Sequence, residues 1–437
     1  MGERAAMVGL WAAGRRWVGA AWPGVVAALV VGGSLWLAIT PGPQNLDLTA
    51  AAMSGPTLDQ VRPSATGDLD PRLGAAVDAI LARRGIAVKT GDVNLFLADV
   101  APELRAEQRV LFQNLRTVGM LVTYRRAEVW TDPLAVRRFG LATGTFRVSM
   151  RYQIYGARLD QTATDVGYTY TVRGGHLVLV ADDHLDQAIG AGRQPWDFGQ
   201  IAVVKRKNVL VIVDQGQQLL AQRLADQTVR TAKSVRKLWK GYLQVVPLVV
   251  AMREPTVLTE LPPMLPGDEP ARIQPMPSPG PDSRPVGGYV VIRPAAIATF
   301  DTAKETHALV HLLAVRLGDS TPRWLAEGMA QYAENLQVAA SGKALEIANA
   351  RTEINRRVIG DLTRLPGDDE FSTTDSYDIS WIAVEHLIKQ IGLKPVTEYY
   401  AQVARRGYNQ FARERLMKQY TGFTETTLVE SLRSVAG

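Results

Sequence analysis

Two histidines separated by three residues are the strongest candidates for chemistry in this sequence. The chain has only five histidines, and His307 and His311 both fall in residues 301–317, whose pattern predicts a helix. Residues four apart lie on one face of a helix, so the two imidazoles could hold a single metal ion. Thr302 and Glu305 have the spacing of a capping box, which favours a helix start at this point.

A glutamate in a second predicted helix could complete the site. Thr321-Pro322 opens this helix with proline at its first position, and the pattern continues through Glu334. Glu327 lies one to two turns in, where its carboxylate could face the histidines. Two imidazoles and one carboxylate form a zinc ligand set that leaves a fourth position for water. On spacing alone, the alternative is a pair of ordinary helical histidines.

The order of the two motifs resembles a known family. The first motif runs from His307 to His311 and reads HALVH, and the second runs from Trp324 to Tyr332 and reads WLAEGMAQY. They resemble the H-E-x-x-H and W-L-x-E-G-x-A-x-Y helices of the peptidase MA-like branch of the gluzincins, the thermolysin-type zinc metallopeptidases. This resemblance implies zinc bound by both histidines and Glu327. The alternative is a decayed site in which the histidines only form hydrogen bonds.

One residue departs from the family pattern. The family has glutamate directly after the first histidine, and that glutamate is the general base that takes a proton from the attacking water. Here the position is Ala308, and losing a positioned base typically costs about 10²–10⁴ in rate. Glu305 is expected to point away from the histidines and to cap its helix. Glu334 is expected to support the site or to be solvated, and Glu385 and His386 cannot be placed from the sequence.

Two tyrosines are weaker candidates. Tyr332 ends the second motif, and Tyr377 begins a segment, residues 377–384, that also resembles the family. Either hydroxyl could polarise a bound carbonyl if hydrolysis survives. The alternative for both is packing in the core.

The preceding part of the chain predicts a separate α+β domain over residues 70–190. Helices are expected at residues 73–84 and 103–116, and strands at 146–155, 168–173 and 176–180, the last two joined by a Gly-Gly turn. Residues 96–100, 109–116 and 195–199 resemble the cone-shaped, nuclear-transport-factor-2-like domain that is often fused ahead of such peptidase domains in actinobacterial envelope proteins.

The peptidase MA-like domain is expected to span residues 200–437. The pattern predicts a hairpin over residues 201–213, a helix at 217–239, strands at 243–251 and 288–293, and a helical C-terminal part. Ten of the 24 prolines fall between residues 255 and 285, so this stretch is expected to be an exposed loop without regular structure.

The N-terminus predicts a membrane anchor. Residues 17–39 are uncharged and long enough to cross the ~30 Å hydrocarbon layer. Arginines precede this segment, so the N-terminus is expected to be cytoplasmic and the rest extracytoplasmic. Residues 1–45 would form the basic tail and single-pass anchor in the cell membrane, and residues 46–69 a linker. The alternative is a cleaved signal peptide, whose apolar region is normally shorter.

Composition narrows the function further. The chain has 437 residues, no cysteine and 49 basic against 43 acidic residues, with no block of Lys or Arg. Disulfides and thiol chemistry are therefore excluded, and nucleic-acid binding is not expected. We expect a membrane-anchored, zinc-binding pseudopeptidase that binds a peptide or protein. The alternative is an active zinc metallopeptidase with a non-standard general base.

Overall fold

The computed structural model describes most of the chain beyond the N-terminal segment. The described residues are 71–130, 132–155, 160–183, 185–190, 193–239, 246–253, 270–279 and 284–436. The predicted anchor and linker, residues 1–69, lie outside them. No helix within these ranges is long and apolar enough to cross a membrane.

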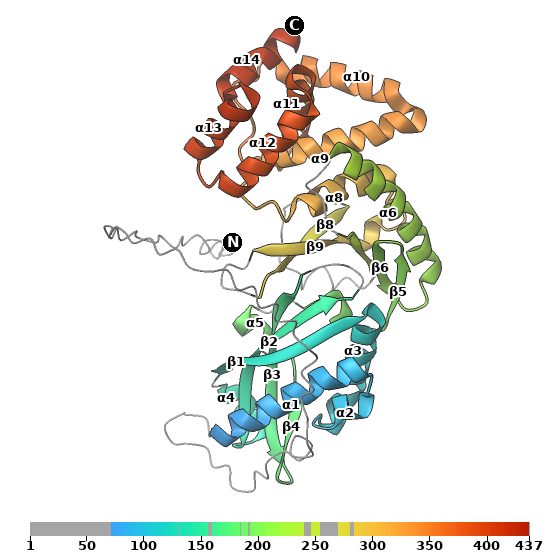
Figure 1. Cartoon of the computed structure of the whole chain (residues 1–437), viewed down its shortest axis with the longest axis vertical. Helices are drawn as coiled ribbons and strands as arrows, with labels where there is room; N and C mark the ends of the chain where they lie inside the picture. The colour runs from blue at the N-terminus through green and yellow to red at the C-terminus, as the bar shows by residue number, and fades with distance from the viewer. Residues whose placement is uncertain are drawn as a thin grey trace, which may run out of the picture. The chain divides into compact units, whose positions relative to one another are not determined.

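The first region is an antiparallel four-stranded sheet with helices on it, in agreement with the α+β prediction. The strands pair in the order β1-β2-β3-β4, and Figure 1 shows α1 lying along the sheet. Residues of β2 alternate between buried and less buried positions, so the apolar side chains face the helices. Gly174 and Gly175 form the predicted turn, with φ of 56° and 76° that glycine adopts without steric cost. The elements are α1 (Pro71–Thr90), α2 (Val93–Leu97), η2 (Pro102–Leu104), α3 (Arg105–Val118), β1 (Met120–Trp130), α4 (Pro133–Phe139), β2 (Thr143–Ile154), β3 (Thr162–Arg173), β4 (His176–Ala181), α5 (Asp186–Ile189) and η3 (Pro195–Asp197).

The second region contains a mixed five-stranded sheet in the order β5-β6-β7-β9-β8. Strands β6, β7 and β9 run parallel, whereas β5 and β8 are antiparallel to their neighbours at the two ends. The parallel strands are buried almost throughout, as expected for the interior of such a sheet. The elements are β5 (Ile201–Arg206), β6 (Val209–Asp214), α6 (Gln218–Leu238), β7 (Leu248–Ala251), β8 (Ala271–Pro277) and β9 (Pro285–Ile292).

The proline-rich stretch is not the loop without regular structure that the sequence predicts. Residues 271–277 form β8, paired with β9 along its length. Because β8 ends the sheet, Pro275 and Pro277 can lack a backbone donor without breaking an interior ladder. The rest of the predicted loop lies largely outside the described residues.

Helices make up the remainder, as predicted, and they carry the candidate site. Figure 1 shows α8 against the sheet and α9 beyond it, with α10 to α14 following. The elements are η4 (Pro294–Ala296), α8 (Thr302–Ala314), α9 (Arg323–Val338), η5 (Ala339–Lys343), α10 (Ala344–Ile354), η6 (Asn355–Ile359), α11 (Thr374–Ile391), α12 (Leu393–Arg406), α13 (Gln410–Thr421) and α14 (Glu425–Ala436).

Candidate metal centre

Helix α8 presents both histidines on one face and Glu305 on another. The N-cap is Asp301, whose Oδ1 accepts a hydrogen bond from the Lys304 amide at 3.0 Å. The predicted capping role of Glu305 is therefore wrong. Its carboxylate is fully buried and accepts hydrogen bonds from Thr228 and Thr231 of α6. As expected, Glu305 faces away from the histidines and cannot act on a group bound between them.

Helix α9 carries the carboxylate of the cluster. Pro322 occupies the N-cap position, and Asp368 accepts a hydrogen bond from the Arg323 amide at 2.7 Å. Glu327 is 1% exposed, and the Nε atom of Arg323 lies 3.6 Å from its Oε1. A residue outside the helix, Asp368, therefore holds the first turn of α9 in place. This orients Glu327, which lies one turn further along the helix.

Three ligand atoms converge where α8 and α9 pack together. The Nε2 atoms of His307 and His311 are 3.2 Å apart. Oε2 of Glu327 lies 3.4 Å from the first and 3.3 Å from the second. Zinc bonds to nitrogen and oxygen of roughly 2.0–2.1 Å give a tetrahedron with edges of about 3.3–3.4 Å. The three atoms therefore have the spacing of three corners of a tetrahedral zinc shell.

The electrostatics of the cluster also suit a cation. Oε2 of Glu327 is buried and has no hydrogen-bond donor among the described residues, an arrangement that is costly unless a cation or donor occupies the space. Burial would raise the pKa of Glu327, but the two imidazoles outweigh burial and hold it well below its usual range. Burial lowers the pKa of His307, but Glu327 and Glu334 outweigh burial and raise it to about 10. The carboxylates therefore favour positive charge at this point.

Glu334 supports the cluster from behind His307. Its Oε2 lies 3.0 Å from Nδ1 of His307. The Glu334 carboxylate accepts a hydrogen bond from Nδ1–H of His307. A metal ion would displace the Nε2 proton of His307, and the neutral tautomer fixed by Glu334 would then present the Nε2 lone pair to the metal. Such carboxylate–histidine pairs orient the imidazole in metal sites. This contact agrees with one of the two roles expected for Glu334 from the sequence.

Ala308 lies at the edge of a cavity over the cluster. The cavity has a volume of about 240 Å³, and Ala308 is 6% exposed. Besides the two histidines of the cluster and Glu334, its lining is mostly neutral. The other lining residues are Pro270, Ala271, Ile273, Lys304, Ala308, Gln331 and Tyr377. Among the described residues, Glu334 is the only carboxylate in this lining, and it is already bound to His307.

The remaining sequence candidates separate into two groups. Tyr377 lines the cavity, whereas Tyr332 does not and packs against the core. Glu385 is bound to Arg351, with the closest N···O distance 2.6 Å, and His386 is 2.8 Å from the hydroxyl of Ser431. Neither of these last two lines the cavity, so they do not contribute to the site.

Two features of the cavity were not found from the sequence. Ala271 and Ile273 come from β8, inside the stretch expected to be a loop. Their alternation with Arg272 and Gln274 was the available strand signal. Gln331 lies one turn after Glu327 on the same helix, so the i, i+4 spacing could have identified it.

A further cavity of about 1110 Å³ adjoins the one over the metal cluster, because Gln331 and Tyr377 line both. Its other walls come from α9, α10, α11 and the segment before α11, including Phe371 and Trp381. The two cavities are therefore neighbours, with Gln331 of α9 and Tyr377 of α11 between them.

Comparison with known proteins gives structural likenesses only. No protein-family profile matches the chain, and no curated protein does. Similar solved structures include an M1 zinc metallopeptidase from Deinococcus radiodurans, with 16% identity, a TM-score of 0.34 and coverage of 60% of this chain and 58% of that chain. A mutant of that enzyme bound to a Tyr-Ser-Ala substrate has 14% identity and a TM-score of 0.34, covering 72% and 62%. Yeast LTA4 hydrolase in complex with bestatin has 11% identity and a TM-score of 0.33, covering 72% and 58%.

The chain spans less than two thirds of the length of each of these proteins. The similar structures include M1 zinc metallopeptidases, and all of those named here have low identity to this chain. The interpretation of the site rests on its own geometry.

Proposed function

We propose that this protein is a membrane-anchored, extracytoplasmic zinc-binding protein with a peptidase-like cleft that binds peptide or protein segments and has lost most hydrolytic activity. The observation that carries the metal site is the spacing of His307, His311 and Glu327, with a buried carboxylate oxygen left without a donor. When bound, zinc would supply a Lewis acid to polarise a carbonyl.

The free edge of strand β8 beside the cavity supports a peptide as the ligand. Strand β8 is the terminal strand of its sheet, and no described strand pairs with its other edge. Its residues Ala271 and Ile273 line the cavity over the cluster. An extended peptide can add to such an edge through backbone hydrogen bonds, which bind many sequences with little dependence on side chains.

The expected loss of hydrolysis follows from the lack of a free general base beside His307, His311 and Glu327. Ala308 has no group that exchanges a proton, and Glu305 is turned toward α6 with both oxygens engaged. A positioned base contributes about 10²–10⁴ in rate. The residues that remain can hold a metal and position a carbonyl, but the described residues offer no uncommitted carboxylate in the cavity lining.

One observation favours an active peptidase as a second candidate. Glu334 lines the cavity, and a swing of its carboxylate away from His307 would bring a base toward a bound carbonyl. In that case Glu334 would replace the missing glutamate. Activity would then depend on Glu334 even at full zinc content.

The anchor, the extracytoplasmic location and the nuclear-transport-factor-2-like character of the first domain are part of the proposal. They rest on residues 17–39, on the arginines ahead of them and on the sequence resemblance. Protease accessibility of intact cells tests the orientation, because the domains beyond residue 70 should be cleaved from outside.

The decisive experiment compares four forms of the full-length chain: wild type, His311→Ala, Ala308→Glu and Glu334→Gln. Zinc content is measured first, and near one zinc per wild-type chain with none in His311→Ala is expected. Hydrolysis of fluorogenic peptides is measured next. A silent wild type with at least 100-fold higher activity in Ala308→Glu supports the proposal.

Two results would overturn it. Activity in the wild type that disappears in Glu334→Gln at unchanged zinc content would establish the second candidate. Absence of zinc in every form would make the cluster a set of hydrogen-bonded side chains without a metal.

A further inference from the structure

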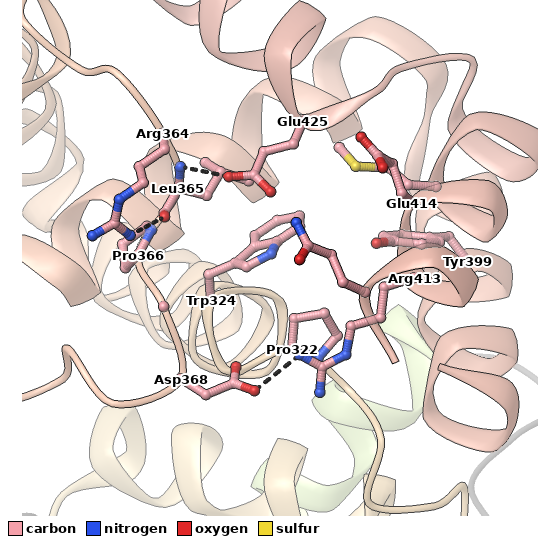
Figure 2. A pocket seen from close by; sticks show the side chains of 13 residues that line it. Pro322, Trp324, Arg364, Leu365, Pro366, Asp368, Tyr399, Arg413, Glu414 and Glu425 are labelled. Carbon is pink, nitrogen blue, oxygen red and sulfur yellow. Dashed lines mark hydrogen bonds and ion pairs between the residues drawn. The ribbon is translucent and has the colours of Figure 1, made fainter. Parts of the chain in front are cut away.

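A third cavity lies between the start of α9 and helices α12 to α14, and it shares Asp368 with the 1110 Å³ cavity. Its volume is about 310 Å³, and it shares no lining residue with the cavity over the metal cluster. Trp324 and Tyr399 supply aromatic surface, and Glu414 and Glu425 supply carboxylates. Figure 2 shows the indole of Trp324 and the hydroxyl of Tyr399 facing the same space.

The hydroxyl of Tyr399 indicates that the space is built for a polar group. Tyr399 is 1% exposed, and its hydroxyl has no hydrogen-bond partner among the described residues. In Figure 2 this hydroxyl points into the cavity and not into the surrounding helices. Because Tyr399 lines the cavity, a ligand in this space can hydrogen-bond to its hydroxyl in place of water.

The charge around the cavity is negative once its own ion pairs are accounted for. Arg364 is paired with Glu370, and Arg413 with Asp368 at 2.9 Å. These two arginines are therefore already neutralised by carboxylates.

No described cation forms an ion pair with either of the other two lining carboxylates, Glu414 and Glu425, although Arg364 also interacts electrostatically with Glu425. Glu425 accepts one hydrogen bond, from the Leu365 amide at 3.1 Å. Glu414 is exposed at the rim and has no partner among the described residues. The ring of Trp324 likewise has no cation over it in the described part of the chain, whereas that of Phe371 has Arg323 at 4.6 Å.

We propose that this cavity binds a compact organic cation, an alkylguanidinium or alkylammonium group. Glu414 and Glu425 supply the opposite charge, Trp324 supplies an aromatic face for a cation, and the Tyr399 oxygen accepts a hydrogen bond. Trp324 and Met417 add apolar surface that the alkyl part of such a cation can contact. The group can belong to a free small molecule or to a Lys or Arg side chain of a protein. This site does not depend on the proposed function of the metal cleft.

The test is saturation-transfer NMR on the full-length chain with n-butylguanidinium as probe and n-butylurea as its uncharged equivalent. Binding of the cation is expected at millimolar concentration or below, with the urea at least tenfold weaker. Tyr399→Phe should weaken binding about five- to tenfold and Glu414→Gln about two- to fivefold. Glu430→Gln removes an exposed carboxylate from α14 outside the cavity, and it should bind like the wild type.

Three results would overturn the proposal. They are equal binding of the urea, no effect of either cavity variant, and loss of binding when zinc is stripped by a chelator, which would place the cation in the metal cleft. A blocked Gly-Arg-Gly tripeptide separates the two sources of the cation. Binding equal to that of n-butylguanidinium identifies a protein side chain, and exclusion of the tripeptide identifies a free small molecule.

Discussion

The Oε2 atom of Glu334 lies 3.0 Å from Nδ1 of His307, on the side of the imidazole opposite to the metal cluster. The carboxylate closest to taking the place of the missing base is thus committed to orienting a ligand. Metal binding and hydrolysis would therefore make competing demands on Glu334. Its carboxylate cannot hold the imidazole of His307 and act as a free general base at the same time.

Removal of Glu334 should weaken metal binding without abolishing it. Glu334→Ala is expected to lower zinc affinity about 10–100-fold, because His307 loses the partner that fixes its tautomer and ring orientation. Glu334→Gln keeps a neutral acceptor and should lose less. Competition with a chromophoric chelator measures both, and Glu430→Gln serves as the control. Unchanged affinity in Glu334→Ala would mean that this carboxylate is free for another role.

Zinc should stabilise the folded chain through the cluster. A ligand that binds only the folded state stabilises it by about 2.7 kcal/mol at 100 times its dissociation constant. Thermal unfolding of chelator-treated protein should therefore shift upward on addition of zinc and remain unshifted with magnesium, which prefers octahedral oxygen ligands. His311→Ala should show no zinc-dependent shift. An equal shift in wild type and His311→Ala would place the stabilising ion elsewhere.

The cluster of His307, His311 and Glu327 could be predicted from the sequence, but the contact of Glu334 with His307 could not. The i, i+4 spacing places His307 and His311 on one face of any helix, so the cluster needed only a carboxylate from a following helix. The contact of Glu334 with His307 depends on how α8 crosses α9, and the sequence does not encode a crossing angle. Strand β8 was missed because prolines usually exclude a strand, and only its position at the edge permits them.

The helix start near Asp301 was predicted, but the capping residue was assigned wrongly for a local reason. Thr302 and Glu305 match the capping-box spacing, but Asp301 is an equally good cap and stands one residue earlier. Choosing the earlier cap frees Glu305 to pair with Thr228 and Thr231 of α6. That pairing is a tertiary contact, about 75 residues away in sequence, and no local pattern indicates it.

Asp197 should make stability fall as pH rises from about 4 to about 6. Burial raises its pKa to about 6, although the Gln194 amide and Arg193 act in the opposite direction. The folded state then holds a proton that the unfolded state releases near pH 3.8, so the free energy of unfolding decreases with pH in this window and is constant above it.

Asp197→Asn should remove this decrease. Urea unfolding of chelator-treated protein at pH 4.5 and pH 7 measures the effect, and the variant should gain stability relative to wild type at pH 7 compared with pH 4.5. Asparagine still accepts the hydrogen bond from the Gln194 amide, which Asp197 accepts at 2.7 Å. The exposed Asp361→Asn is the control and should keep the wild-type profile. A pH-independent difference between Asp197→Asn and wild type would contradict the prediction.

Gly328 should prove essential because α11 packs directly against it. A Cβ atom at this position would lie 2.3 Å from the Ser380 carbonyl oxygen and 2.6 Å from Cγ2 of Val384. Gly328→Ala is expected to lower the free energy of unfolding by about 1–3 kcal/mol, measured by urea unfolding. It should also weaken zinc binding, because Glu327 is the preceding residue and moves with the helix.

Gly360→Ala is the control variant. Gly360 has ordinary helical angles and open space at its Cβ position, so Gly360→Ala should be neutral or stabilising by about 0.4–1 kcal/mol. Equal stability and equal zinc affinity in both alanine variants would mean that α9 and α11 can separate without disturbing the metal centre.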